Sequence, residues 1–485
     1  MRNFLLFIFC LSIIVCPVVY AAQPQEMDIQ SLRKSIILGD VRFDVTTKNA
    51  AAKEHFLLGA AFLHAFMYDL AIRQFQAAEK LDPGFAMSYW GEAMANKHPI
   101  WNFENLAAGQ AVLSRYEQHK DQRSLTEKEK YYLDSVKKLF SDQSLLDRDR
   151  AYYSAMKVFY EHYPKDPNVG AFYALSQLGL ASDFPDDPSS PGYLRTGRKL
   201  IDYLFTQFSD HPGVVHYYLH YHDTSDRKLA GQALPAARIA LTVMRSSSHV
   251  THMAAHIYRR LELWDDYILA NQISVTAADT LCKMLNDYPL YACNAENKYH
   301  SLEWLQDGYL KKGKFKQAQK LVDRIRDAAA RDKSVLYKQW YYRMWARQVL
   351  VSQNWNIPAL RIQPITKRDE QIYWSAYSEC GALLASSFLA IHKNQPVESQ
   401  LKRLNKLIKY ANGIPDPYIR QACQIARLEV KAEFSRCHND KENAAYFTNK
   451  ALALQKKQIS TELTPSLSFL SANEYYQNYV LAHKK

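Results

Sequence analysis

Residues 52–85 read AKEHFLLGAAFLHAFMYDLAIRQFQAAEKLDPGF, and this stretch decides the fold. Its small and apolar residues recur at the offsets of a 34-residue repeat that is built from two antiparallel helices. Seven positions carry the residues that this pattern requires: Leu58, Gly59, Phe62, Ala71, Phe75, Ala78 and Pro83. The small residues let the two helices approach closely, the two phenylalanines fill the groove between them, and the proline ends the second helix.

The same period continues, with more variation, further along the chain. A helix is predicted at 86–99, and helix pairs are predicted at 252–278 and 301–329. The positions that keep the pattern in these two pairs are Tyr258, Trp264, Asn271, Leu302, Leu305, Tyr309, Gly313 and Ala318. Glycine is rare, at 15 of 485 residues, and no clear run alternates apolar and polar residues as strands do. The sequence therefore predicts an all-α fold, an α-solenoid of degenerate tetratricopeptide-like helix hairpins.

Two connectors rich in proline and other turn formers interrupt this rhythm, at 182–192 and 352–370. We interpret the first as a loop within the array and the second as a link to another segment. The predicted organisation is a repeat array over 43–351, followed by a helical segment over 371–485 that continues or caps the array. Within that segment one helix is expected at 417–437, and a last helix near 467–485 is expected to cap the stack.

The first 22 residues, MRNFLLFIFCLSIIVCPVVYAA, have the layout of a secretory signal peptide. Their apolar run is short for a membrane anchor, and no other stretch is apolar enough to cross a bilayer. We therefore expect an exported protein, periplasmic or secreted, with no transmembrane segment after the signal is cleaved. The net charge of +12 is spread along helices, which favours a solvated surface, and export argues against nucleic acid as a partner.

Five cysteines remain after the signal, Cys282, Cys293, Cys380, Cys423 and Cys437. This odd number allows at most two disulfides and leaves one free thiol. A local bridge between Cys282 and Cys293 is one possible pairing, because the two flank a predicted turn. Cys423 and Cys437 cannot bond to each other, since 14 residues of one helix hold them roughly 20 Å apart.

Seven of the chain's 16 histidines lie between residues 211 and 256, in HPGVVHYYLHYHD and HVTHMAAHIYRR. Helical spacing places two sets of side chains on one face each: His216, His220 and Asp223 in the first segment, and His249, His252 and His256 in the second. If the two helices are neighbours, these stripes bring up to five imidazoles and one carboxylate into a shared space. Such donors suit Zn²⁺, Fe²⁺, Ni²⁺ or Cu²⁺, so a divalent transition metal is the candidate cofactor.

Three interpretations of the stripes stay open. The preferred one is packing, in which the imidazoles hydrogen-bond to one another, to Tyr217 and Tyr218, or to the backbone. Metal binding is the second, and metal-free ligand binding or acid–base chemistry is the third. No HExxH motif accompanies the histidines, and no serine or cysteine nucleophile can be assigned, so no reaction follows and enzymatic activity is left open.

Three further histidines lie near the stripes. His211 is expected to shape the turn that enters the first helix, and His222 points off the stripe and is expected to be solvated. His300 is interpreted as a core residue or as a further ligand. The complete candidate binding set is His211, His216, His220, Asp223, His249, His252, His256 and His300, and the candidate metal ligands are this set without His211 and His300.

The chain resembles a large and mostly uncharacterised family of tetratricopeptide-containing proteins. The resemblance covers about residues 43–330 and is carried, in order, by 65–95, SDFPDDP, DHPGVVHYYLHYHD, SSHVTHMAAHIYRRLELWDDYILAN and YHSLEWLQDGYLKKGKF. It implies a histidine pattern at His211 and in both stripes, with a carboxylate at Asp223, but it implies no role for them. The chain departs from the pattern at Ala254, where proline is usual, and at Glu262, where glycine is preferred.

Two hypotheses for the function follow. The first is an exported repeat scaffold that binds a protein or a peptide, as helical repeat stacks commonly do. The alternative is a metal-binding protein or a metal-dependent enzyme that uses a histidine-rich site between two helices. Metal content and the behaviour of histidine variants would separate the two.

Overall fold

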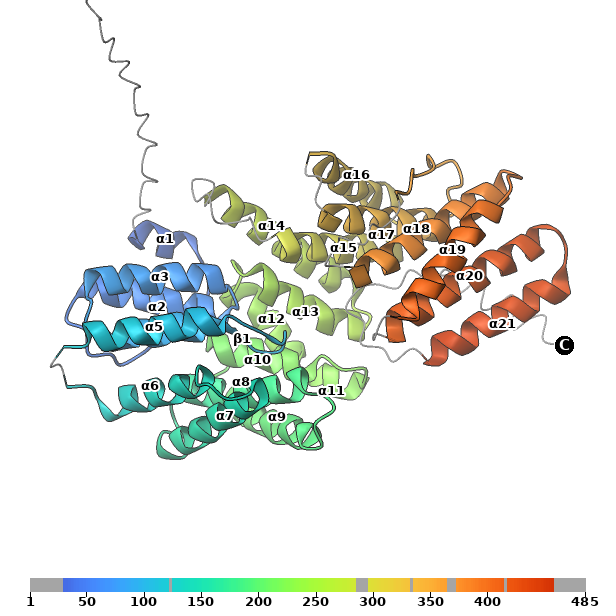
Figure 1. Cartoon of the computed structure of the whole chain (residues 1–485). Helices are drawn as coiled ribbons and strands as arrows, with labels where there is room; N and C mark the ends of the chain where they lie inside the picture. The colour runs from blue at the N-terminus through green and yellow to red at the C-terminus, as the bar shows by residue number, and fades with distance from the viewer. Residues whose placement is uncertain are drawn as a thin grey trace, which may run out of the picture.

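The computed structural model describes residues 29–121, 124–284, 295–331, 335–363, 372–413 and 417–457. These residues form 21 α-helices and one two-stranded antiparallel sheet, and helices far apart in sequence pack into one elongated array (Figure 1). The prediction of an all-α fold built from helix hairpins is confirmed. Among the described residues, no helix combines the length and the apolar character that crossing a membrane requires.

The N-terminal part contains α1 (Ile29–Ser35), α2 (Ala50–His64), α3 (Tyr68–Leu81), α4 (Ala86–Met94), β1 (Lys97–His98), β2 (Phe103–Glu104), α5 (Leu106–His119), α6 (Glu127–Leu139), α7 (Leu145–His162), α8 (Pro167–Asp183) and α9 (Ser190–Gln207). The middle contains α10 (Pro212–His222), α11 (Arg227–Gln232), α12 (Leu234–Val243), α13 (Ser248–Arg260), α14 (Trp264–Met284) and α15 (Ala295–Lys311). The C-terminal part contains α16 (Phe315–Arg331), α17 (Val335–Ser352), α18 (Ile372–His392), α19 (Glu398–Ala411), α20 (Pro417–Cys437) and α21 (Lys441–Lys457).

The first hairpin, α2 and α3, forms for the reasons that its sequence indicates. Asn49 caps α2 by accepting the backbone N–H of Ala52. The Phe75 ring of α3 fills the groove so closely that a Cβ atom at Gly59 would lie 2.8 Å from it. A larger residue at Gly59 would therefore push the two helices apart.

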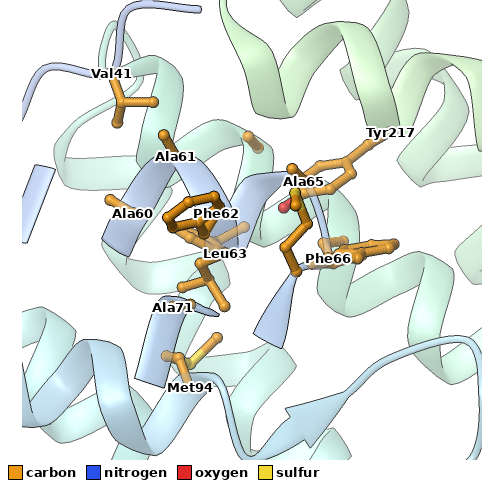
Figure 2. Packing of buried hydrophobic residues seen from close by; sticks show 14 of the residues in the cluster. Val41, Ala60, Ala61, Phe62, Leu63, Ala65, Phe66, Ala71, Met94 and Tyr217 are labelled. Carbon is orange, nitrogen blue, oxygen red and sulfur yellow. The ribbon is translucent and has the colours of Figure 1, made fainter. Parts of the chain in front are cut away.

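Two clusters of buried apolar residues run through the array. The first extends from Leu32 to Trp304 and the second from Val275 to Ala451, so that they meet at α14 and α15. Figure 2 shows part of the first cluster, where Phe66 and Tyr217 lie near each other at the junction of the first hairpin with α10; their rings stack at 5.6 Å. The middle helices are therefore fixed from both sides by packed cores.

The predicted connectors and cysteine pairings have mixed outcomes. The connector at 182–192 narrows to the six residues between α8 and α9, and α17 ends where the connector at 352–370 was predicted to begin.

A disulfide that was not predicted joins Cys380 of α18 to Cys423 of α20, with their Cα atoms 5.5 Å apart. Cys437 is an exposed free thiol, and Cys282 is disulfide-bonded. Cys293, the signal peptide at 1–22 and the capping helix expected near 467–485 all lie outside the described residues.

Candidate metal centres

Three helices from the middle of the chain, α10, α13 and α15, position the candidate site (Figure 1). Helix α13 contacts both α10 and α15. Both stripe-bearing helices have well-formed starts, because His211 accepts the backbone N–H of Val214 through Nδ1 and Ser247 accepts that of Val250. The prediction that His211 shapes the turn into α10 is confirmed.

Six imidazoles converge in two groups of three. The first triad is His216 and His220 of α10 with His249 of α13, and the second triad is His252 and His256 of α13 with His300 of α15. Within each triad, one potential ligand atom from each residue lies within 4.8 Å of the other two. Each triad thus combines an i, i+4 pair from one helix with a single histidine from a neighbouring helix.

The two stripes face each other as predicted, because His220 lies 3.3 Å from His249 and His256 lies 2.7 Å from Asp223, but their imidazoles form two triads rather than one ligand set. His249 and His256 lie on the same side of α13 but are seven residues apart, which is about 10 Å along the helix axis. One ion with bonds of about 2.1 Å cannot span that distance. The stripe on α13 is therefore divided, with His249 directed to α10 and His252 and His256 directed to α15.

In the second triad, hydrogen bonds determine which nitrogen of two imidazoles carries the proton. The Nδ1 of His256 lies 2.7 Å from a carboxylate oxygen of Asp223, which can only accept, so this Nδ1 is the donor. The Nδ1 of His252 lies 2.8 Å from the amide oxygen of Asn271, and the amide nitrogen of Asn271 donates to the backbone oxygen of Tyr267. Because that second bond fixes the amide orientation, Nδ1 of His252 is also a donor.

A mismatch follows at the opposite side of these two rings. Their Nε2 atoms lie 3.1 Å apart, and in neutral imidazoles both carry a lone pair and no hydrogen. His252 is 3% exposed and His256 is 8% exposed, so water does not separate the two lone pairs. Two buried acceptors in contact are unfavourable unless a cation lies between them.

In the first triad, the Nε2 atoms lie at similar distances, and hydrogen bonding determines the position of the proton on one imidazole. Nδ1 of His216 donates to the backbone oxygen of His64, 2.6 Å away, so its Nε2 carries a lone pair. That Nε2 lies 3.1 Å from Nε2 of His220, which in turn lies 3.3 Å from Nε2 of His249. A proton on His220 can bridge to only one of its two neighbours at a time.

Burial keeps most of these imidazoles neutral. Burial, followed by the adjacent imidazoles, lowers the pKa of His216, His220, His249 and His252 well below 6.5, and it lowers the pKa of His300 to about 3. Burial alone would raise the pKa of Asp223, but His256 and Arg260 together hold it below its ordinary value. Five of the six imidazoles are therefore neutral nitrogen donors, and one ionised carboxylate lies behind His256.

Aromatic rings enclose both triads. Phe66 contacts His216 with ring centroids 4.4 Å apart, and Trp101, at the turn between β1 and β2, approaches His249 edge-on at 5.4 Å. In the second triad, Trp304 stacks on His256 at 4.2 Å. These rings exclude water from the imidazoles while leaving His220 and His300 partly exposed.

Two histidines outside the triads differ from what the sequence predicted. His222 is not solvated: it is fully buried, its Nδ1 donates to the backbone oxygen of Tyr218, and its Nε2 lies 3.2 Å from Asp202. Helix α10 is packed on all sides, so a position off the stripe is still inside the protein. His64 was not among the residues predicted from the sequence. It is buried, and its ring contacts Tyr217 and Asn168.

A third group with metal-type donors lies in the C-terminal part and has another explanation. His392, Glu433 and Cys437 each bring one potential ligand atom within 4.8 Å of the others. Glu433, however, accepts from Arg436 at 2.8 Å and from His392 at 2.8 Å. Opposite charges and a hydrogen bond account for this group without an ion.

Comparisons with known proteins leave the function open. No family model matches the chain, and no curated protein matches it. Among solved structures, yeast Tom70 is similar at 13% identity, with 90% of this chain and 89% of that chain covered and a TM-score of 0.36. A human IFIT1 dimer with PPP-AAAA is similar at 14% identity, with 84% and 91% covered and a TM-score of 0.29. Similarities at this level assign no function to the chain.

Proposed function

We propose that this protein binds divalent transition-metal ions at the two histidine triads. The observation that carries the proposal is the contact between Nε2 of His252 and Nε2 of His256, 3.1 Å apart with both Nδ1 atoms acting as donors. A metal ion accepts both lone pairs and so converts an unfavourable contact into two bonds. It also gives His300, the third member of the triad, a role that packing does not give it.

Three of the nitrogen–nitrogen distances within the triads fit metal coordination. Metal–nitrogen bonds of about 2.05 Å place two ligand nitrogens about 3.3 Å apart in a tetrahedral site and about 2.9 Å apart in an octahedral one. The three Nε2 pairs in the triads measure 3.1, 3.1 and 3.3 Å. Neutral imidazoles favour zinc, copper or nickel over magnesium or calcium, and three protein ligands leave a coordination position open.

Partners behind the ligands support the same proposal. Histidines that bind metals usually donate their other ring nitrogen to a carboxylate or a carbonyl oxygen, which fixes the ring and the tautomer. Three of the six imidazoles have such an acceptor: Asp223 for His256, Asn271 for His252, and the backbone oxygen of His64 for His216. Asp223 is therefore proposed to orient a ligand rather than to bind the ion.

A single proton is the main alternative to a metal ion in the second triad. An imidazolium at His256 would donate from Nε2 to His252 and would remain paired with Asp223. That arrangement leaves His300 without a function in the group, and Arg260 already neutralises Asp223 at 2.9 Å. A metal ion uses all three imidazoles and needs no additional charge on His256.

We further propose, from the sequence, that the protein is exported and that it binds a protein or a peptide. The helical array holds the triads between two packed cores, and export would place them in the periplasm or outside the cell. An open pocket of about 380 Å³, lined by residues of α3, α4 and α5, provides space for a side chain of a bound protein or peptide. Such a partner would dock away from the triads.

Metal content of untagged protein tests the proposal. Wild-type protein dialysed against Zn²⁺ is expected to retain two ions per chain, and His220→Ala and His252→Ala are each expected to retain one. His222→Gln changes a buried histidine outside the triads and is expected to retain two. Folded wild-type protein without bound metal would disprove the proposal, as would two ions retained in both alanine variants.

A further inference from the structure

The charges around the triads are unusual for a metal centre with protein ligands only. Each triad supplies three neutral imidazoles, so a bound divalent ion keeps its full charge of two. In the first triad, the side chains in contact with the imidazoles are aromatic: Phe66, Trp101 and Tyr217. Among the described residues, no carboxylate forms a hydrogen bond or an ion pair with this triad.

The second triad has a carboxylate, but an arginine already pairs with it. Asp223 contacts Nδ1 of His256 through one oxygen and accepts from Nε of Arg260, 2.9 Å away, through the other. Its negative charge is therefore shared between the imidazole and the guanidinium. It offsets only part of the charge of an ion on the opposite side of the His256 ring.

The next carboxylates on α15 also lie close to guanidinium groups. One helical turn from His300, Glu303 accepts from both Arg343 and Arg347, each at 2.9 Å. Arg259 lies over the Trp304 ring and 3.9 Å from Asp307.

We infer that each metal-loaded triad takes a small anion as its fourth ligand. A divalent ion held only by neutral donors and enclosed by aromatic rings is poorly solvated, so an anion in the open position gains a strong interaction in a site of low polarity. Access is possible because one imidazole of each triad, His220 or His300, is partly exposed. The ligand class is a monodentate anion such as a carboxylate, a halide or azide. This inference rests on the proposed metal binding.

The charge at Arg260 provides a specific test of the inference. Arg260 neutralises the only carboxylate that contacts a triad imidazole among the described residues. Without the guanidinium, Asp223 would offset part of the charge of the ion in the second triad and would weaken anion binding there. Without the carboxylate, anion binding would strengthen. Both changes are expected to have a smaller effect on the first triad, because Asp223 acts on His220 only through space.

The experiment uses full-length protein loaded with Cu²⁺ and titrated with azide, and it follows the charge-transfer absorption of the copper–azide complex. Wild-type protein is expected to bind two azide ions per chain. In a His220→Ala background, in which only the second triad is intact, Arg260→Gln is expected to lower azide affinity about tenfold and Asp223→Asn to raise it about tenfold.

The matched control is the same pair of substitutions in a His252→Ala background, in which only the first triad is intact. There, azide affinity is expected to shift by a smaller factor, because Asp223 acts on His220 only through space whereas it contacts His256 directly. Two bound copper ions without an azide signal would overturn the inference and leave the proposed metal binding intact. Shifts in the same direction for both substitutions would also overturn it, and absence of bound copper would instead refute the metal proposal. If Arg260→Gln does not fold, Asp223→Asn and the wild-type titration still decide the outcome.

Discussion

Two polar groups lie one turn apart on α15 and have opposite character. His300 belongs to the second triad, in which lone pairs of neutral imidazoles meet. Glu303 is fully buried and accepts from Arg343 and Arg347 of α17. Both of these contacts to Glu303 join a guanidinium donor to an acceptor of opposite charge. In the triad, acceptors contact acceptors.

This difference separates a structural role from a binding role. Buried polar groups are nearly always matched, so the network around Glu303 is explained by folding alone. The triad departs from that rule at a site enclosed by a well-packed core, and packing does not remove the mismatch. Removing a partner from the network around Glu303 should therefore lower the stability of the protein, and supplying a cation to the triad should raise it.

The largest expected effect is on the matched network. Glu303→Gln removes the carboxylate that two buried guanidinium groups contact, and it should lower the free energy of unfolding by about 3 to 5 kcal/mol. Denaturant-induced unfolding measured by circular dichroism provides the value. Glu442→Gln, at an exposed position of α21, is the control and should change stability by less than about 0.5 kcal/mol. A loss below about 1 kcal/mol for Glu303→Gln would mean that this network is not a structural anchor.

Adding a metal ion should stabilise the mismatched group. Zn²⁺ at 100 times the dissociation constant is expected to raise the free energy of unfolding by about 2.7 kcal/mol for each occupied triad. Thermal unfolding of the metal-free and the zinc-loaded protein measures the difference. The double variant His220→Ala/His252→Ala should show no such increase. An equal increase in wild type and double variant would place the zinc elsewhere.

The acceptor behind His256 should have a smaller effect than the ligands. Asp223→Asn weakens the hydrogen bond that orients His256, and it should reduce the zinc affinity of the second triad 10- to 100-fold, which corresponds to about 1.4 to 2.7 kcal/mol. Competition with a chelator measures this affinity in the His220→Ala background. Asp202→Asn, beside His222 and outside the triads, should leave the affinity unchanged. Complete loss of zinc in Asp223→Asn would indicate that Asp223 is itself a ligand.

The sequence predicts local features of the fold better than contacts between distant helices. Helical periodicity is sufficient for the first hairpin, for the cap at His211 and for the stripes, because these depend on neighbours within about seven residues. The assignment of His300 to the second triad depends on how α15 packs on α13, which periodicity does not specify. The disulfide between Cys380 and Cys423 likewise joins two residues that are 43 positions apart in the sequence. His222 was assigned to solvent because one face of α10 was assumed to be exposed, whereas α10 is packed on all sides.

A third buried group lies between these two extremes. Glu79 of α3 and Glu92 of α4 are both buried, and Arg115 of α5 pairs with each of them. One guanidinium cannot neutralise two carboxylates. Burial, followed by the hydrogen bond with Glu92, raises the pKa of Glu79 to about 8. Here a proton supplies the missing partner, as a metal ion is proposed to do in the triads.

The proton on Glu79 predicts a dependence of stability on pH. The unfolded chain releases this proton near pH 4.5, whereas the folded protein holds it until about pH 8. Between these values the folded state binds more protons, so this group's contribution to the free energy of unfolding falls as pH rises, by at most about 1.4 kcal/mol per pH unit. Glu79→Gln removes the titration, so the stability of the variant relative to wild type should increase from pH 5 to pH 8 and level off above it. Denaturation series at several pH values measure the difference, and Glu442→Gln should show a constant one. If the difference for Glu79→Gln is also constant, Arg115 alone satisfies both carboxylates and the proton is not shared.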